Sequence, residues 1–338
     1  MASHGLGTGI SRLPHRGRSR HGMDDDRQEV WRMKRFCLRP FCLWAQALRI
    51  HIFSASLIPV LLGTVVAQAE GPISLLRFGL VVVGVFCYHG GANLVNDLYD
   101  LEADRLNLEA SLFNGGSRVL PSRLTSTAQV SKAAILCYIV GTICAFVLAF
   151  TGGGPGVLLL ALAGFGCGYF YSAPPLRLAA TGYGELCVGL AFGPFLVVGT
   201  AAALTGSFLP NALLVSLPVG TLITAVIFLN EFPDYESDRR SGKRTLVVRL
   251  GRKRSVRVLA ALLMMAFVLL VINLIILGLK WFVVVSPLTT APLAVWVWHR
   301  VRRNLEQTRQ LVSACAGMIF LHLANGLTLL IALLLIRK

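Results

Sequence analysis

Long runs of apolar residues that contain no charge dominate this chain. Five of them are about as long as one membrane-crossing helix, which needs roughly 20 residues; they span 50–69, 78–96, 258–279, 281–299 and 310–336. Two further runs, 133–176 and 186–230, are about twice as long, and each is interrupted once by a turn sequence, at 151–155 and at 205–211. Apolar positions do not alternate with polar ones, as they would in the strands of a membrane barrel. The pattern therefore predicts nine transmembrane helices.

The composition supports the same fold class. Of the 338 residues, 55% are apolar and 14% are charged, whereas the charged share of an ordinary soluble domain is about 25%. The mean hydropathy is +0.68. These values exclude the soluble globular classes and indicate an all-α integral membrane protein.

The distribution of positive charge predicts the orientation of the helices. The formal net charge is +16. If the N-terminus lies in the cytosol, 28 of the 32 Lys and Arg residues fall on the cytosolic side, and only Arg77, Lys280, Arg337 and Lys338 fall on the other. This is the asymmetry of the positive-inside rule. The basic charge is therefore interpreted as topological, and no nucleic-acid partner is expected.

Residues 1–40 differ from the rest of the chain. They are basic and rich in Gly, Ser, Arg and His, and they contain no apolar stretch of the kind found in a secretory signal. We expect a disordered cytosolic tail ahead of a membrane domain at 41–338. An organellar presequence is the alternative, and the acidic cluster at 24–26 argues against it.

The eight cysteines carry no recognisable chemistry. None forms a C-x-x-C pair, and most fall inside the predicted helices. A disulfide framework or a zinc site is therefore not expected. We interpret them as small apolar residues of helix packing.

The acidic residues are concentrated in two short segments. Eight of the sixteen Asp and Glu residues lie in 96–105 and 230–239, which share the pattern N-[DE]-x-x-D-x-E-x-D-R and begin 134 residues apart. Each segment comes where an even-numbered predicted helix, the second or the sixth, leaves the membrane on the cytosolic side. The chain thus contains an internal repeat of its most polar part.

The spacing within each segment places three carboxylates on one face of a helix, because positions i, i+3 and i+7 share a face. The predicted stripes are Asp97, Asp100 and Asp104 in the first segment and Glu231, Asp234 and Asp238 in the second. Like charges on one face repel unless a cation bridges them. Oxygen ligands of this kind suit Mg²⁺, which often binds through a few carboxylates together with substrate phosphates. The repeat therefore predicts a Mg²⁺–diphosphate site at the membrane surface.

Two other interpretations of these segments exist. Charge runs are often solvated helix ends, but the same ten-position pattern occurring twice at equivalent helix ends is difficult to explain in that way. A proton or cation pathway would place carboxylates in the middle of the membrane. None of the nine predicted spans contains one there, which argues against a transporter.

Basic and glycine-rich residues follow each stripe. Lys243 comes shortly after the second, and the turn 114–118, which ends at Arg118, follows the first. Backbone N–H groups of such turns and cationic side chains both bind phosphate oxygens. By contrast, we interpret Arg252, Lys253 and Arg254 as lipid-headgroup contacts.

A third polar cluster lies at the end of the fourth predicted helix. It contains Tyr171 and two prolines that end the helix, and Arg177 and Glu185 flank the loop that follows. Inside that helix, the glycines at 164, 166 and 168 are expected to serve close helix packing.

These motifs match a known family. The segment NDxxDxxxD at 96–104 resembles the first aspartate motif of the UbiA superfamily of intramembrane prenyltransferases, ExxDxxxD at 231–238 resembles the second, and YSxPP at 171–175 is similar to a cytosolic segment of the family. The resemblance covers about residues 43–336. One departure is Arg49-Ile50 at the start of the first helix, where the family often has Arg-Pro.

Finer details resemble one branch of the superfamily, the 1,4-dihydroxy-2-naphthoate prenyltransferases of menaquinone synthesis. These details are GGSRVL at 115–120, GPFLVVGT at 193–200 and DRRSGKRTL at 238–246. The Arg-Thr-x-x-Arg-Pro-like run that the 4-hydroxybenzoate branch typically carries after its first motif is absent.

The resemblance implies a fold, a cofactor and a reaction. The fold would be nine transmembrane helices around a central cavity with polar cytosolic cap loops, in a bacterial cell membrane. Mg²⁺ would bridge the two stripes and the diphosphate of a polyprenyl donor. The prenyl group would pass to an aromatic acceptor, which in this branch loses CO₂.

The resemblance also assigns roles to residues of this chain. The catalytic set is Asp97, Asp100, Asp104, Asp234, Asp238 and Lys243. The metal ligands are Asp97, Asp100, Asp104, Glu231, Asp234 and Asp238. The substrate-binding residues are Arg49, Asn93, Asn96, Arg118, Tyr171, Asn230 and Arg239.

Other functions remain open at this point. Within the superfamily, the acceptor could be homogentisate, a chlorophyllide or a glycerophospholipid precursor, or the protein could be a membrane terpene cyclase without an acceptor. A cation transporter, from a different class, is the least favoured. Chain length of the donor and oligomeric state do not follow from the sequence.

Overall fold

The structure of the protein is a computed structural model that describes residues 40–111, 113–278 and 287–335. The chain divides into two compact units, Met1–Trp44 and Ala45–Lys338. Of the first unit, only residues 40–44 are described, and they begin α2 (Pro40–Ala47). The predicted disordered tail lies, apart from residue 40, outside the described residues.

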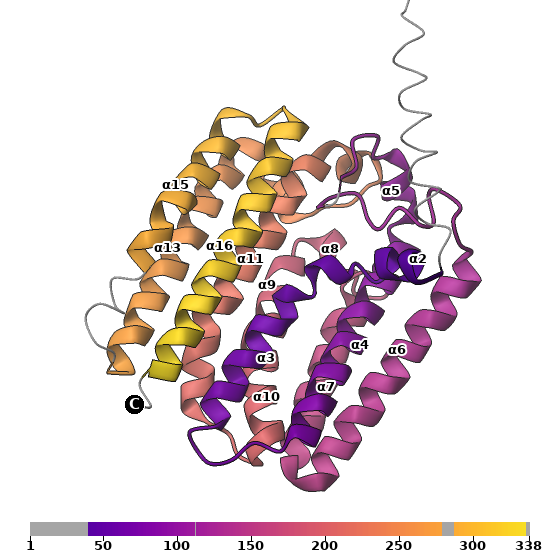
Figure 1. The fold of residues 1–338 in the computed structure, drawn as a ribbon. Helices are drawn as coiled ribbons and strands as arrows, with labels where there is room; N and C mark the ends of the chain where they lie inside the picture. Colours follow the sequence, from indigo (N-terminus) through magenta and orange to yellow (C-terminus); the bar gives the residue numbers. More distant parts are fainter. Residues whose placement is uncertain (1–39, 112, 279–286, 336–338) are drawn as a thin grey trace, which may run out of the picture. The chain divides into compact units, whose positions relative to one another are not determined.

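The second unit is helical (Figure 1). Its long helices are α3 (Ser54–Ala67), α4 (Leu75–Tyr99), α6 (Thr127–Leu148), α7 (Pro155–Phe170), α10 (Leu196–Thr205), α11 (Pro210–Arg240), α13 (Arg252–Ile276), α15 (Pro287–Arg303) and α16 (Thr308–Leu335). The connecting turns and short helices are η1 (Ile50–Ile52), α5 (Leu101–Leu106), η2 (Ala149–Gly153), α8 (Leu178–Thr181), α9 (Gly184–Leu190), η3 (Ala191–Phe195) and α12 (Leu246–Leu250). Across the described ranges, β-pairing is limited to an isolated bridge between Ser111 and Asn114.

Helices occupy each of the nine predicted spans, and seven of them are long and apolar enough to cross a membrane within the described ranges. Three of these seven join adjacent elements: η1 and α3 form Ile50–Ala67, α6 and η2 form Thr127–Gly153, and α9, η3 and α10 form Gly184–Thr205. The other two helices are shorter: α7 has 16 residues and α15 has 17. The predicted span at 281–299 begins in residues that are not described. The all-α membrane class is therefore confirmed, and the count of nine crossings stays a prediction.

Two apolar clusters hold the helices together. One lies where α3 packs on α10, with contributions from α4 and α16, and includes the fully buried Leu62 and Val197. The other lies where α11 packs on α13 and α16, which in turn pack on α15, and it includes the fully buried Phe228 and Leu321. Burial of side chains of this kind against one another is the main source of helix packing in such a bundle.

Small residues let α11 approach the α9–η3 segment closely. A Cβ atom on Gly220 would lie 2.6 Å from the carbonyl oxygen of Gly189, so only glycine fits there. The predicted role of the glycines in α7 is different, however. A Cβ on Gly164 or Gly166 would meet no atom within 4 Å. Of the three glycines, only Gly168 approaches neighbours, namely Ala92 of α4 at 3.2 Å and Tyr138 of α6 at 3.3 Å. The prediction of close helix packing is thus wrong for Gly164 and Gly166, because the neighbouring elements leave space beside them.

The seven cysteines in the described ranges are free thiols.

The helix ends position the two acidic segments differently. α4 ends at Tyr99, and Asp100, with φ −97° and ψ 5°, separates it from α5. α11 instead continues without a break to Arg240, although Pro233 lies inside it. The second stripe therefore lies on one helix, as predicted, whereas the first is divided between α4 and α5 at Asp100.

Candidate active site

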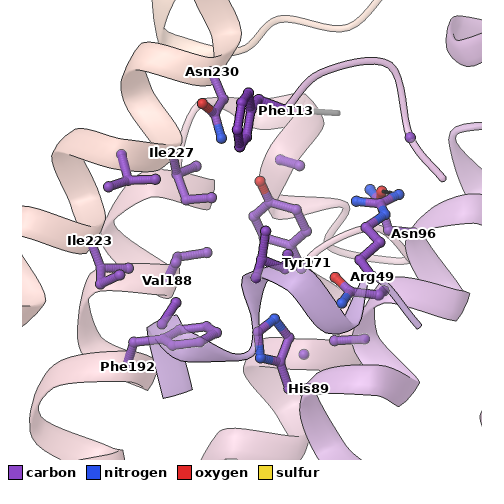
Figure 2. A pocket seen from close by; sticks show the side chains of 18 of the residues that line it. Arg49, His89, Asn96, Phe113, Tyr171, Val188, Phe192, Ile223, Ile227 and Asn230 are labelled. Atoms are coloured by element: carbon purple, nitrogen blue, oxygen red, sulfur yellow. Dashed lines mark hydrogen bonds between the residues drawn. The ribbon is translucent and has the colours of Figure 1, made fainter. Parts of the chain in front are cut away.

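The two acidic segments meet at one cavity of about 350 Å³. Its polar end carries five carboxylates: Asp100, Asp104, Glu231, Asp234 and Asp238. In Figure 2, Asn230 and Phe113 lie at one end of the view and His89 and Phe192 at the other, with Tyr171 between the walls. The cavity thus changes from charged to apolar and aromatic along its length.

Each acidic segment is held in part by the loop of the other. The side chains of Asn107 and Asn114, which follow the first segment, donate to Oδ1 of Asp234 at 2.7 and 3.0 Å. In return, Nζ of Lys243, which follows the second segment, lies 2.7 Å from Oδ2 of Asp100. Nζ of Lys243 is also 3.7 Å from Oδ1 of Asp238. The repeat is therefore assembled by reciprocal contacts into one site.

Negative charge exceeds positive charge in this site. Among the described residues that line the cavity, only Arg49 and Lys243 face the five carboxylates as permanent cations. Burial raises the pKa of Asp104 to about 7; Arg49 opposes this shift, and the neighbouring Asp100 adds to it. Burial alone would lower the pKa of Lys243, but Asp100 and Asp238 hold it above its ordinary value. A buried site with this surplus of carboxylates favours the binding of a cation.

Asp97 is more deeply buried than its two neighbours in the motif. It is 2% exposed and does not line the cavity. Its carboxylate accepts hydrogen bonds from the guanidinium of Arg49 and from both the backbone N–H and the hydroxyl of Ser117. Asp97 nonetheless remains near its two neighbours. Arg49, which it binds, also interacts with Asp100 and Asp104, and Gly116, next to Ser117, lies against Asp104.

Asp104 lies against a turn that only glycine can form. Gly116 has a φ of +74°, and a Cβ on it would lie 2.0 Å from Oδ2 of Asp104. The left-handed conformation and the lack of space both require glycine. The glycine-rich turn predicted to bind phosphate therefore packs directly on a carboxylate of the first segment.

Four of the predicted substrate-binding residues also line the cavity, in addition to Arg49. They are Asn93, Asn96, Tyr171 and Asn230. Asn96 donates 2.9 Å to the hydroxyl of Ser172, so the segment after α7 is tied to the first motif. Oδ1 of Asn230 is buried without a hydrogen-bond partner.

Two predicted residues lie elsewhere. Arg118 donates to the backbone carbonyls of Asp104 and Asn107 and does not line the cavity. Arg239 is exposed and pairs with Glu236 at 3.4 Å. The structure thus gives Arg118 a role in holding the first loop and leaves Arg239 outside the cavity.

Sequence reasoning missed several residues of the site. Asn107 lines the cavity. It is the first amide side chain after the first acidic segment, and this position in the sequence could have suggested it as a site residue. Glu185 accepts from the backbone N–H of Leu246 at 3.1 Å and is hydrogen-bonded to Glu231. His89 and His322 line the apolar part of the cavity, and neither ring nitrogen of His322 has a partner. No sequence signal marks these histidines, since each lies alone within a transmembrane pattern.

The donor set fits a hard divalent cation. Carboxylate and amide oxygens are the ligands that Mg²⁺ prefers, and the polar end of the cavity presents both. Within the described ranges, no three carboxylate, imidazole or thiolate groups converge closely enough to hold a metal by themselves. A metal here would therefore need further oxygen ligands, such as phosphate or water.

The profile of the UbiA prenyltransferase family matches residues 56–324, most of the chain and both acidic segments. The chain belongs to this family. It is accordingly a prenyltransferase, and its apolar helices make it an integral membrane protein.

Curated relatives agree with this assignment. The chain is 30% identical over 236 residues to a 1,4-dihydroxy-2-naphthoate octaprenyltransferase of Bacillus subtilis, covering 70% of this chain and 74% of the relative. It is 24% identical to a 2-carboxy-1,4-naphthoquinone phytyltransferase of Synechocystis, over 84% and 91% of the two chains. It is also 27% identical to a UbiA prenyltransferase domain-containing protein 1 of Xenopus tropicalis, over 84% and 81%.

A solved structure shares the fold. A UbiA homologue from Archaeoglobus fulgidus, described as bound to DMAPP and Mg²⁺, superposes with a TM-score of 0.61 at 19% identity, covering 85% of this chain and 98% of the homologue.

Proposed function

We propose that the protein transfers a polyprenyl group from a polyprenyl diphosphate to 1,4-dihydroxy-2-naphthoate, with loss of the carboxyl group as CO₂, in menaquinone synthesis. The observation that carries this proposal is the joining of two acidic segments, distant in sequence, around the polar end of a cavity whose other end is apolar. A substrate with an anionic head and a hydrocarbon chain matches this change from polar to apolar lining along the cavity.

The metal ligands are proposed to come from both acidic segments. Asp100 and Asp104 of the first and Glu231, Asp234 and Asp238 of the second line the cavity. Bound Mg²⁺ would neutralise the diphosphate and stabilise it as a leaving group. The solved homologue that is described as bound to DMAPP and Mg²⁺ supports this choice of metal. Asp97, with Arg49 and Ser117, would keep the first segment in position.

The reaction breaks one bond and forms another. The allylic C–O bond of the donor breaks, and its electron pair leaves with the diphosphate. The ring carbon that bears the carboxylate would form the new C–C bond to the allylic carbon. Its bond to the carboxylate would then break, with the electron pair restoring the aromatic ring as CO₂ departs, so that no proton is gained or lost. Lys243, already among the carboxylates, would add positive charge beside the leaving diphosphate.

The acceptor choice is supported by relatives. Two relatives carry a naphthoate or naphthoquinone in their names. Aromatic walls also suit a planar ring: His89 stacks on Phe53 at 4.8 Å between ring centroids and meets Phe192 edge-on at 5.1 Å.

The membrane topology is proposed from charge. Nine crossings with a cytosolic N-terminus would place both acidic segments, with the loops that follow them, on the cytosolic side. The membrane is proposed to be the cell membrane of a bacterium, and one relative of the chain is from Bacillus subtilis. Reporter fusions to each terminus test this topology, and reporters that place both ends on one side would refute it.

The activity is tested with the full chain reconstituted in lipid. The protein is incubated with Mg²⁺, a labelled polyprenyl diphosphate and, separately, dihydroxynaphthoate, 4-hydroxybenzoate or homogentisate. We expect a prenylated dihydroxynaphthalene lacking the carboxyl carbon, detected by mass, and no product in excess EDTA. Equal turnover with homogentisate, or full turnover in EDTA, would refute the acceptor or the metal role respectively.

A further inference from the structure

A second, smaller cavity continues from the apolar end of the first. This deep cavity, of about 110 Å³, lies between α4, α6, α7 and the η3–α10 segment, and these elements lie beside one another in Figure 1. The two cavities share five lining residues: Val85, Tyr88, Gly164, Ala191 and Leu196. The deep cavity is therefore an extension of the candidate active site and not a separate surface hollow.

The extension runs in one direction on every helix. On α4, the main cavity reaches from the acidic end down to Val85, and the deep cavity continues to Leu80. On α7 it continues from Gly164 to Val157, and on α10 from Leu196 to Ala203. From Asn96 to Leu80 the path along α4 is about 24 Å at 1.5 Å per residue. The combined space is long and narrow and points away from the carboxylates.

The lining of the deep cavity excludes a polar occupant. Among the described residues that line it, none is charged, and the walls are mostly Leu, Val, Ala and Gly. A hydroxylated or carboxylated aromatic ring would lose most of its hydrogen bonds there. An apolar space of this kind stays dry and favours apolar guests.

Gly164 stands at the junction of the two cavities. A Cβ on it would meet no atom within 4 Å, so a side chain there would extend into the open path. The ring of Tyr88, which also lines both cavities, packs closely on α6. A Cβ on Gly141 of α6 would lie 2.4 Å from Cδ1 of Tyr88, and the Tyr88 hydroxyl lies 3.0 Å from the hydroxyl of Thr142. Because Tyr88 is held against α6, the width of the path at this point depends on the size of residue 164.

We propose that the deep cavity holds the distal isoprenoid units of the prenyl donor, and that Gly164 sets the length of chain the enzyme accepts. This proposal rests on the proposed prenyl transfer and adds a binding site for one part of its donor. The first units, next to the diphosphate, remain in the main cavity. A larger side chain at 164 would block only the units beyond the junction.

The test is the donor-length profile of Gly164→Leu. The reconstituted variant is given dimethylallyl, geranyl, farnesyl and geranylgeranyl diphosphates with a fixed acceptor and Mg²⁺. We expect kcat/KM for the two longest donors to fall about 10-fold or more, while that for dimethylallyl diphosphate changes less than about threefold. The ratio between long and short donors is the informative quantity, because a general loss of folding lowers all four.

Gly166→Leu is the matched control. Gly166 lies on the same helix, a Cβ there also meets no atom within 4 Å, and it lines neither cavity. We expect this variant to keep the unmodified length profile. An unchanged profile in Gly164→Leu, or the same change in both variants, would overturn the assignment while leaving prenyl transfer intact. If the unmodified protein transfers no prenyl group, the proposed function fails and this assignment fails with it.

Photolabelling of the unmodified protein provides a second, independent test of where the distal isoprenoid units bind. A geranylgeranyl diphosphate with a photoreactive group at its far end should label peptides containing 141–148 of α6 or 196–203 of α10. A farnesyl analogue with the group on its first unit should label residues of the main cavity instead. Labelling of α3 and α16 by the far-end probe, in place of α6 and α10, would place the chain elsewhere and refute the proposal.

Discussion

The two acidic segments share a ten-position sequence pattern, yet they differ in backbone conformation and in which carboxylates line the cavity. The second is one face of an unbroken helix, and Glu231, Asp234 and Asp238 all line the cavity. The first is divided where α4 ends, and only Asp100 and Asp104 line it. A repeat in sequence therefore guarantees neither the same backbone conformation nor the same contacts for each carboxylate.

The difference is clearest at the first acidic position. Asp97 is satisfied by Arg49 and Ser117, so it has little capacity left for a metal. Its counterpart Glu231 faces another carboxyl group, Glu185, and accepts from the backbone N–H of Val247 at 3.1 Å. One position carries a buried ion pair that fixes structure. At the other, burial and the neighbouring Glu185 raise the pKa of the Glu231 carboxyl well above its ordinary value.

The largest expected effect comes from the central carboxylate of either segment. Asp100→Asn and Asp234→Asn should each lower kcat about 100-fold or more, because loss of one metal-site charge costs several kcal/mol of transition-state stabilisation. The rates are measured in lipid after size-exclusion and circular dichroism show a folded protein.

Matched controls exist within the same two segments. Glu102 and Glu236 belong to the repeat but are exposed or half-exposed and line neither cavity. Glu102→Gln and Glu236→Gln should keep near-normal rates. If the Asp and Glu variants behave alike, the segments are solvated helix ends and the comparison between them has no catalytic meaning.

A smaller effect is expected for Lys243→Ala. Lys243 crosses from the second segment to Asp100 of the first, and its positive charge gains importance as the diphosphate leaves. The variant should lose about 10-fold in kcat and less in donor affinity. Steady-state kinetics separate the two quantities, and Lys253→Ala, outside the cavity, serves as the control. If neither variant changes kcat or donor KM, Lys243 has no catalytic role and only contributes to the positive charge of the cytosolic side.

The smallest effect is expected for Ser117→Ala, which tests the structural role of Asp97. Loss of one hydrogen bond to a buried carboxylate should lower the free energy of unfolding by about 1–3 kcal/mol. Turnover at a temperature well below the transition should change less than about threefold, since Ser117 does not line the cavity. Thermal denaturation in detergent and kinetics are compared. A large loss of rate with unchanged stability would mean that Asp97 takes part in catalysis.

Much of this arrangement follows from the sequence. The charge-free runs locate the long helices, because a helix in lipid must satisfy its own backbone and present apolar side chains. The repeat also identifies which helix ends carry the site, since both segments follow even-numbered helices and must emerge on one side.

The rest depends on contacts between distant parts of the chain. Asp97 looks like a metal ligand in the sequence, and only the approach of Arg49 and Ser117, 48 and 20 residues away, shows that it is engaged. Gly164 is a second example. In the sequence it suggests close helix packing, but the neighbouring helices decide whether a glycine allows contact or leaves open space, and here they leave space. Helical spacing likewise does not reveal the break at Asp100.

The central claim is that both segments form one metal–diphosphate site, and metal binding tests it most directly. Mn²⁺ serves as a paramagnetic substitute for Mg²⁺, and an unreactive thio-analogue of geranyl diphosphate replaces the donor. The account predicts that binding of Mn²⁺ in the presence of the analogue is lost in Asp100→Asn and in Asp234→Asn alike, and is kept in Glu236→Gln. Retention of analogue-dependent Mn²⁺ binding in either Asp variant would contradict a shared site.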